Sequence, residues 1–323
     1  MKLITSRVYL IDEPNPLKKI ELAGRTCYKS DSEFTDESAI KFFETMTNRG
    51  HYAMLEHGEA TFELLGLDVG EIDENFLKIP YIRSSYKCMR YYITMSCSHM
   101  QRHEEILEGV NNFTKDLFYH MKYMFERFYI EGADESCLIE KLDNVQIKLL
   151  RDVTEIVDFN MADLELHKSE TFKFICDRAV SHELVRHRHS VAQESQRYCN
   201  YSMDKFGNEI TCVVPHDWDT WTEEAKQIFI DSCTHDEINY FKLLDMGKLP
   251  QDARRVLPNA TKTEVILTMP IKFWYHFINL RSIGTTGAPH PDMKRLADVV
   301  NVQMKEIQNK YVNYIVSQPG GVW

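Results

Sequence analysis

The sequence predicts an α+β (α/β) fold in which an antiparallel or mixed sheet is flanked by helices. Alternating apolar residues, which are typical of strands, occur near residues 60–64, 171–176 and 265–269. In other segments the apolar residues recur every three to four positions, which is the spacing of amphipathic helices. We expect a single domain over residues 1–323, with an α-rich insertion at about 66–168.

The first helix is predicted over residues 36–48. Thr35 can cap its N-terminus, and Gly50 can end it in the left-handed conformation. One apolar face is formed by Ala39, Phe42, Phe43 and Met46. A half-buried strand follows a short turn, since Ala60, Phe62 and Leu64 alternate with polar neighbours.

The spacing of apolar residues in the insertion predicts that it is rich in α-helix. Apolar residues recur at this spacing from Ile106 to Phe125, and a second helical pattern follows around 142–157. The segment contains no chemical motif that we can identify, so we attribute its apolar residues to core packing.

The next strand, at residues 171–176, leads into a helix over residues 178–186 that Asp177 can cap. Its polar face consists of His182, Glu183, Arg186 and His187. Polar residues of both charges at the end of a helix that follows a strand indicate a site. An ordinary surface helix is the alternative.

The remaining elements follow the same rules. Phe206-Gly207-Asn208-Glu209 is a turn signal, and Ile210, Cys212 and Val214 alternate as a strand after it. The strand at 265–269 runs through Pro270 into a helix that ends near Leu280 and places Arg281 at its far end. A final amphipathic helix covers residues 293–311.

Composition limits the classes of function. The formal net charge of −11 argues against non-specific nucleic-acid binding, which needs an excess of Lys and Arg. The eight cysteines are irregularly spaced without a C-x-x-C pair, as expected for free thiols in a reducing compartment. The first residues lack a signal-peptide apolar run, and no apolar run reaches membrane-spanning length. We expect a soluble, cytoplasmic protein without nucleic-acid or membrane partners.

The most informative segment is RHRHSVAQESQRY, residues 186–198. Its three guanidiniums, on Arg186, Arg188 and Arg197, suit phosphate oxygens. Neutral donors and acceptors for a base or ribose come from Gln193, Ser195 and Gln196, and Tyr198 can stack. The segment therefore predicts a site for a phosphate-bearing heterocycle, with an exposed basic loop as the alternative.

Other chemistries have weaker support. Imidazoles at His51, His57, His182, His187 and His189 could bind a metal ion, but the neighbouring arginines repel cations and no HExxH motif occurs. We therefore predict no metal ligands. Cys199 or Ser195 could be a nucleophile, but the sequence places no histidine as its base. Glycine-rich dinucleotide and P-loop motifs are absent from the sequence.

The chain resembles the flavin-dependent thymidylate synthases. Their signature is Arg-His-Arg, seven residues, Ser and then Arg-Tyr; here Arg186-His187-Arg188 is followed by six residues, Ser195 and Arg197-Tyr198. The spacing corresponds to a deletion of one residue next to His189.

Four further segments resemble this family in the same order. One of them, SHELVRHR at residues 181–188, is similar to His-Gln-x-x-Arg-His-Arg, with Glu183 in place of the glutamine. GHYAMLEH, residues 50–57, is similar to Gly-His-x-Ser/Thr-x-x-Glu-His, with Ala53 in place of the hydroxyl residue. ARRVLP, residues 253–258, is similar to Arg-x-x-Leu-Pro. PIKFWYHFINLR, residues 270–281, matches the last motif at its histidine and final arginine, with Pro270 and Lys272 replacing flavin contacts.

The resemblance implies roles for individual residues. Arg281 is the expected catalytic residue, which stabilises the uracil ring as its N3 loses a proton. The expected contacts to dUMP are Glu183, Arg186, Gln193, Glu194, Ser195, Gln196, Arg197, Arg254 and Arg281. The expected contacts to FAD are His51, Ala53, Arg186, His187, Arg188, Lys272 and His276.

The implied reaction is the reductive methylation of dUMP to dTMP with methylenetetrahydrofolate, FAD and NADPH as reductant. The implied partners are dUMP and folate small molecules, in a homotetramer whose sites are shared between subunits. Two other hypotheses remain open. One is a catalytically degenerate nucleotide-binding relative, and the other is a histidine-based metal-dependent hydrolase.

Overall fold

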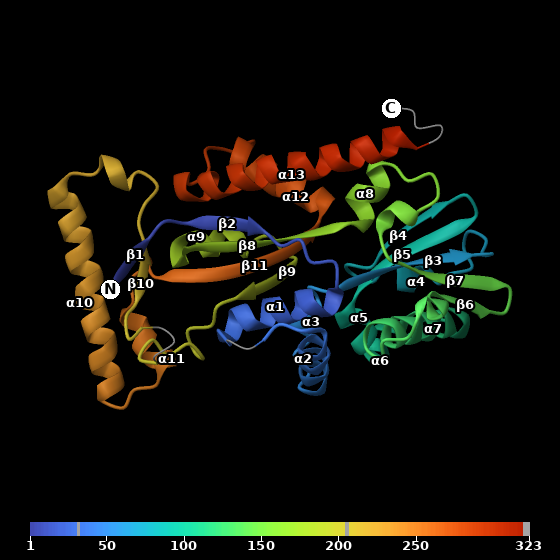
Figure 1. Cartoon of the computed structure of the whole chain (residues 1–323), viewed down its shortest axis with the longest axis horizontal. Coiled ribbons are helices and arrows are strands. Elements are labelled where there is room, and N and C mark those ends of the chain that lie inside the picture. Colours follow the sequence, from blue (N-terminus) through green and yellow to red (C-terminus); the bar gives the residue numbers. More distant parts are fainter. Residues whose placement is uncertain (31–32, 204–206, 319–323) are drawn as a thin grey trace.

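The computed structural model describes residues 1–30, 33–203 and 207–318. Its first sheet is antiparallel, with the strand order β2-β8-β11-β9. Helices α12 and α13 cover one face of this sheet, and α1 lies on the other (Figure 1). The bounds are β2 (Arg7–Leu10), β8 (Ser169–Asp177), β9 (Ser190–Gln193), β11 (Lys262–Pro270), α1 (Pro16–Tyr28), α12 (Ile271–Ile278) and α13 (Pro291–Ser317).

Both faces of β11 are buried. Val265, Leu267 and Met269 belong to a core shared with Trp274 of α12. Ile266, which points the other way, packs with Ala23 and Cys27 of α1. This confirms the strand predicted at 265–269 and explains why it is covered by helices on both sides.

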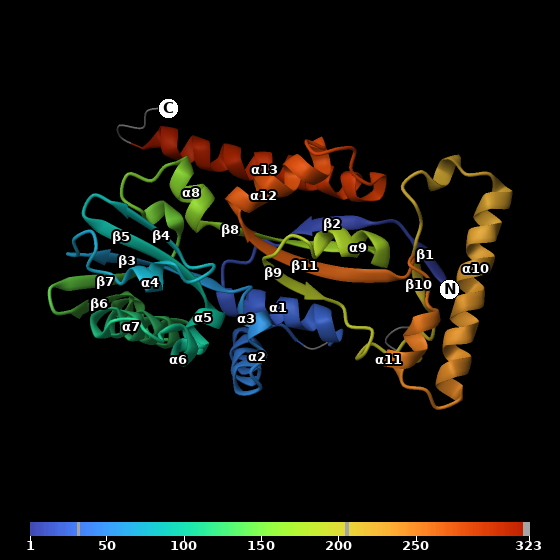
Figure 2. The same cartoon turned by 180° about the vertical axis from the view of Figure 1, so that it is seen from behind.

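A second sheet was not anticipated. It has the strand order β4-β5-β3-β7-β6, and only β3 (Glu59–Leu65) was predicted. The other strands lie within the insertion and are β4 (Arg83–Lys87), β5 (Arg90–Ser96), β6 (Ile139–Leu142) and β7 (Val145–Leu150). In Figure 2 this sheet forms the end of the molecule opposite α10 (Glu223–Asp245).

The helix predicted around 142–157 is wrong. Residues 139–150 form the β6–β7 hairpin, in which Leu142 pairs with Val145 and Asp143 has a φ of 52°. Val145, Ile147 and Leu149 alternate and are buried in the core beneath α7 (Asn112–Tyr129). Because short apolar runs fit both periods, the helical spacing was misleading here.

The insertion does contain the helix expected from the spacing between Ile106 and Phe125, but its regular part begins at Asn112 because Asn111 caps it. Several shorter helical segments accompany it: α4 (Glu74–Leu77), α5 (Cys97–Gln101), α6 (His103–Ile106), η1 (Glu135–Leu138), η2 (Val153–Glu155) and α8 (Met161–His167).

The helices predicted around the motifs are confirmed. α2 (Asp36–Asn48) begins with a capping box between Thr35 and Ser38, and Gly50 follows it with a φ of 66°. α3 (Tyr52–Leu55) comes next. The Asp177 carboxylate caps α9 (Arg178–Leu184), which ends two residues earlier than predicted.

A small outer layer completes the fold. β1 (Lys2–Ile4) pairs in parallel with β10 (Thr211–Val213), and α10 packs against them (Figure 1). The shorter segments here are η4 (Trp218–Thr220), α11 (Pro250–Ala253) and η5 (Arg254–Val256). Phe206 of the predicted turn lies outside the described residues, whereas Gly207 and Asn208 both have positive φ.

All eight cysteines are free thiols, and only Cys88 is exposed. Within the described residues, every helix is too short or too polar to cross a membrane. The observed mixture of helices and mainly antiparallel sheets confirms the predicted α+β class.

Trp274 should be a main source of stability for the first sheet. Its ring is fully buried, lies 4.6 Å from that of Phe172, and its Nε1 donates to the Glu170 carbonyl at 3.0 Å. We expect Trp274→Ala to lower the free energy of unfolding by about 3–5 kcal/mol in urea titrations. Ile228→Ala, at a position that is 66% exposed on α10, is the control and should change it by less than about 0.5 kcal/mol. Equal effects of the two substitutions would contradict this account of the core.

Candidate active site

Arg281 is held against α9 by three contacts. Its Nη1 forms an ion pair with the Glu183 carboxylate, and its Nη2 donates to the Glu183 carbonyl at 3.5 Å. Its Nε donates to Nε2 of His187 at 3.3 Å. The structure therefore brings together three residues that the sequence predicted for the site, although 94 positions separate His187 from Arg281.

His187 acts as a hydrogen-bond acceptor here because its imidazole is neutral. Burial, together with the smaller effect of the nearby positive charge of Arg281, lowers the pKa of His187 to about 4. The ring packs edge-on against Phe277 at 4.9 Å between centroids, and that of His276 lies 6.4 Å away. At neutral pH the charge of Arg281 is therefore compensated by Glu183 alone among these residues.

The local backbone explains the position of Arg281. After α12 the chain continues as a π-helical turn, η6 (Asn279–Ile283), which Gly284 ends with a φ of 80°. A Cβ on Gly284 would lie 2.9 Å from the Gly287 carbonyl oxygen, so a side chain does not fit. The Ser282 hydroxyl donates to Asp298 of α13 at 2.6 Å, which anchors the turn. Such π-turns occur frequently at functional sites.

The segment after β9 carries several predicted dUMP contacts. The Gln193 amide donates to the hydroxyls of Ser181 at 3.0 Å and Thr263 at 3.3 Å. The Ser195 backbone N–H donates to the Cys27 carbonyl at 3.1 Å. Gln196 is buried and hydrogen-bonds Tyr201, so the segment is fixed by the protein itself.

The rings of Tyr198, which is exposed, and Tyr28, which is half-buried, link this segment to α1 and to the start of α3. The Arg197 guanidinium lies 5.3 Å from the centroid of the Tyr198 ring, and this ring lies 5.3 Å from that of Tyr28. The Tyr28 hydroxyl is 3.4 Å from Nδ1 of His51, which is exposed like its neighbour Ala53. The predicted residues His51, Ala53 and Arg197 thus lie on one connected surface.

Glu194 is buried in a cluster of charges. Its carboxylate accepts from Lys262 at 2.8 Å, and Lys262 also contacts Glu264 at 2.7 Å. Lys173 contacts Glu264 at 2.7 Å, and Lys29 forms an ion pair with it. Burial would raise the pKa of Glu264, but Lys262 and Lys29 outweigh this effect and hold it well below its usual range. These lysines were not predicted, because they come from separate elements.

Arg254, another predicted contact, is half-buried in η5, and its Nε donates to the Gln251 carbonyl at 3.2 Å. Its charge acts on Arg178 at the start of α9. Burial chiefly lowers the pKa of Arg178, and Arg254 contributes in the same direction. Arg178 was not predicted as a site residue, although it directly follows the helix cap.

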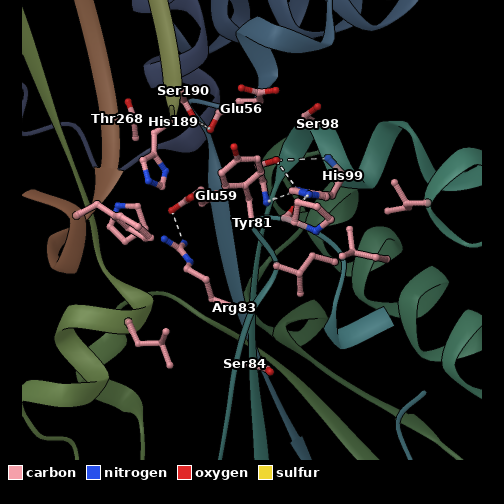
Figure 3. A pocket seen from close by; sticks show the side chains of 18 of the residues that line it. Glu56, Glu59, Tyr81, Arg83, Ser84, Ser98, His99, His189, Ser190 and Thr268 are labelled. Carbon is pink, nitrogen blue, oxygen red and sulfur yellow. Dashed lines mark hydrogen bonds and ion pairs between the residues drawn. The ribbon is translucent and has the colours of Figure 1, made fainter. Parts of the chain in front are cut away.

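A cavity of about 920 Å³ lies between the first sheet and the insertion. Figure 3 shows Glu56, His189, Ser190 and Thr268 on one side, and Tyr81, Ser98 and His99 on another. The predicted flavin contact Lys272 also lines it, next to Phe273. The insertion residues around this cavity escaped prediction because they belong to no motif.

The predicted residues therefore fall into three groups: those around Arg281, those around Arg197, and Lys272 in the cavity. Arg186 and Arg188 are exposed beside the first group. Among the described residues, no group of three or more His, Cys, Asp or Glu side chains is placed to hold a metal ion.

The family model for "Thymidylate synthase complementing protein" matches residues 9–91 and 164–308. The chain belongs to this family. The resemblance recognised in the sequence is thereby confirmed, and the internal stretch that the match leaves out, 92–163, falls within the insertion.

Relatives named flavin-dependent thymidylate synthase support the assignment. That of Geobacter sulfurreducens is 38% identical over 152 residues, which cover 46% of this chain and 62% of the relative. That of Mycobacterium avium is 30% identical over 174 residues, covering 46% and 65%. The chain thus matches less than two thirds of the length of these relatives. A UMP/dUMP methylase structure, PolB from Streptomyces cacaoi, covers 96% of this chain at 14% identity, but its TM-score of 0.39 is too low to support an argument.

The neutral state of His187 can be measured directly. We expect its imidazole to titrate near pH 4 by NMR, and Arg281→Ala to raise this pKa part of the way towards 6.5. The reason is that the substitution removes a repulsive charge but leaves the ring largely buried. Arg295→Ala, at an exposed position on α13, is the control. An unchanged titration in Arg281→Ala would show that burial alone lowers the pKa.

Proposed function

We propose that this protein is a flavin-dependent thymidylate synthase that converts dUMP to dTMP with methylenetetrahydrofolate, FAD and NADPH. The observation that carries the proposal is the position of Arg281, a half-buried and fixed cation held by Glu183 of α9 and by His187 of the signature segment. A fixed cation of this kind stabilises the charge that develops on a uracil ring without any rearrangement of solvent. The family match supports the same conclusion.

The residues present fit a flavin. The cavity of about 920 Å³ lies in the size range of cofactor sites and contains exposed rings of Tyr81 and Phe273 together with the Lys272 ammonium. When bound, FAD supplies the hydride for the methylation. We propose that Lys272 in the cavity and Arg188 at its edge hold the cofactor, with the remaining contacts from His51, Ala53, Arg186, His187 and His276.

The roles proposed for the substrate contacts follow from charge. Arg186, Arg197 and Arg254 bind the phosphate and orient the base through forked donors. Arg281 stabilises negative charge at the uracil as N3 loses its proton. Glu183, Gln193, Glu194, Ser195 and Gln196 shape the base and ribose site, either directly or by fixing the segment after β9.

We propose that complete sites form between subunits of a homotetramer. Arg281 lies on the α12–α13 side of the first sheet, whereas the Ser195 segment contacts α1 on the opposite side (Figure 1). One chain therefore separates Arg281 from the proposed contacts of the Ser195 segment. The single-domain organisation with an insertion at 66–168 and the cytoplasmic location likewise remain predictions.

The reaction itself is the first test. We expect dTMP to form from dUMP, methylenetetrahydrofolate and NADPH only when FAD is present or copurifies, as followed by chromatography of the nucleotides. Omission of FAD from apoprotein is the control. Folded protein that binds dUMP but yields no dTMP would instead favour the degenerate relative, since Ala53, Pro270 and Lys272 replace flavin contacts of the family.

Arg281→Ala should abolish turnover more than it weakens binding. We expect kcat to fall by about 10²–10³-fold because a preorganised charge is lost at the reacting ring, whereas the Kd for dUMP in calorimetry should rise less than about tenfold. Arg281→Lys should restore part of the activity, since it keeps the charge but loses the forked geometry. Arg295→Ala is the control. Equal losses of turnover and dUMP binding would contradict the proposed role.

A further inference from the structure

One wall of the cavity comes from the insertion. The segments 79–84 and 96–106 face the motif residues Glu56, His189 and Ser190 across it (Figure 3). The family match covers the first of these segments and leaves out the second, since it stops at residue 91 and resumes at 164. The contacts of this wall therefore indicate a role for the insertion.

Tyr81 is the point at which the wall reaches the signature segment. Its hydroxyl donates to the Arg188 carbonyl at 3.3 Å, and its ring meets that of His189 edge-on at 5.6 Å between centroids. His189 in turn lies 4.2 Å from the ring of Phe273, the neighbour of Lys272. The Tyr81 side chain is nevertheless 58% exposed, so much of its ring is free to face a ligand.

The backbone of Tyr81 is strained. Its φ of 71° lies in the left-handed region, which a bulky side chain rarely adopts and which costs on the order of 1 kcal/mol. Such a conformation persists only where the surroundings impose it, and residues of this kind cluster at ligand sites.

The residues on both sides of Tyr81 impose this conformation. The Ser96 backbone N–H donates to Nδ1 of His99, so the proton of this imidazole is on Nε2, which donates to the Pro80 carbonyl at 2.9 Å. The Arg83 side chain is 8% exposed and binds Glu59 at 2.7 Å and Ser169 at 2.8 Å. The wall is thereby tied to β3, through Glu59, and to β8, through Ser169.

Arg83 also offers a donor to a ligand. Its Nε is buried and has no hydrogen-bond partner among the described residues, although the residue lines the cavity. A buried donor without a partner is unfavourable by about 1–3 kcal/mol, which a bound acceptor can offset.

We propose that the insertion is part of the cofactor site and that Tyr81 is its positioning residue, which fixes the Arg188 backbone and the His189 ring at the edge of the cavity. This inference rests on the proposed function, because it takes the ligand of the cavity to be FAD. It gives the insertion a role at the site rather than one in core packing alone.

The test uses full-length protein and two substitutions. Tyr81→Phe removes the hydroxyl and keeps the ring, whereas Tyr81→Ala removes both. We expect the Kd for FAD, from fluorescence titration, to rise about three- to tenfold in the first variant and at least about tenfold in the second. The Kd for dUMP should remain within about twofold, because Tyr81 contacts none of the proposed dUMP residues other than through the Arg188–His189 segment.

A matched control lies in the same insertion. Tyr119 is 44% exposed and meets His103 edge-on at 5.6 Å, but neither residue lines the cavity. Tyr119→Phe and Tyr119→Ala should leave the affinity for FAD unchanged. In protein without FAD, the NMR signal of the His189 ring should shift in Tyr81→Ala and stay close to its original position in Tyr81→Phe.

The outcomes distinguish a failure of the proposed function from a failure of the role proposed for Tyr81. If the unaltered protein binds no FAD, the proposed function is overturned and this inference with it. If it binds FAD and both Tyr81 variants bind it equally well, the inference alone is overturned. Parallel weakening of FAD and dUMP binding with a lowered unfolding temperature would also overturn it, since that pattern indicates general destabilisation.

Discussion

The fold depends on β11 being buried on both of its faces. It pairs with β8 along its whole length, from Lys262 opposite Asp177 to Pro270 opposite Ser169, and with β9 on its other edge. Helices cover it above and below, through Trp274 on one side and α1 on the other. A slip of one residue would turn Glu264 and Thr268 into the apolar core around Trp274, so the register of this strand is strongly specified.

The two ends of this fixed strand carry different parts of the site. At its start, the Lys262 ammonium and the Glu264 carbonyl hold Glu194, which belongs to the segment of Arg197. At its end, Thr268 lines the cavity and Pro270 leads into the helix that carries Lys272. Nine residues of strand span roughly 30 Å, so the two parts cannot contact one small ligand within one chain. A rigid strand that separates the parts favours assembly as the way to combine them.

The sequence was sufficient to predict the elements and site residues whose signal is local. Caps and spacing identified α2 and α9, and a motif identified Arg281 together with Glu183 and His187. Contacts between residues that are distant in the sequence could not be predicted. Lys262 and Glu194 are 68 positions apart, and no motif in either segment indicates that the two residues form an ion pair. The β6–β7 hairpin was mistaken for a helix because its apolar residues also fit helical spacing. Tyr81 could not be found, since a strained φ is a property of the tertiary structure.

The chemistry of Arg281 follows from how its neighbours respond to burial. An imidazole relieves the cost of desolvation by losing its proton, whereas a guanidinium cannot, so His187 becomes neutral and Arg281 stays charged. Glu183 then supplies the compensating charge in the ligand-free chain. In the function that we propose, a uracil ring that approaches Arg281 competes with this carboxylate. Because a neutral uracil competes poorly and an N3 anion competes well, the arrangement favours the deprotonated state of the base over its ground state, which is the differential binding that catalysis requires.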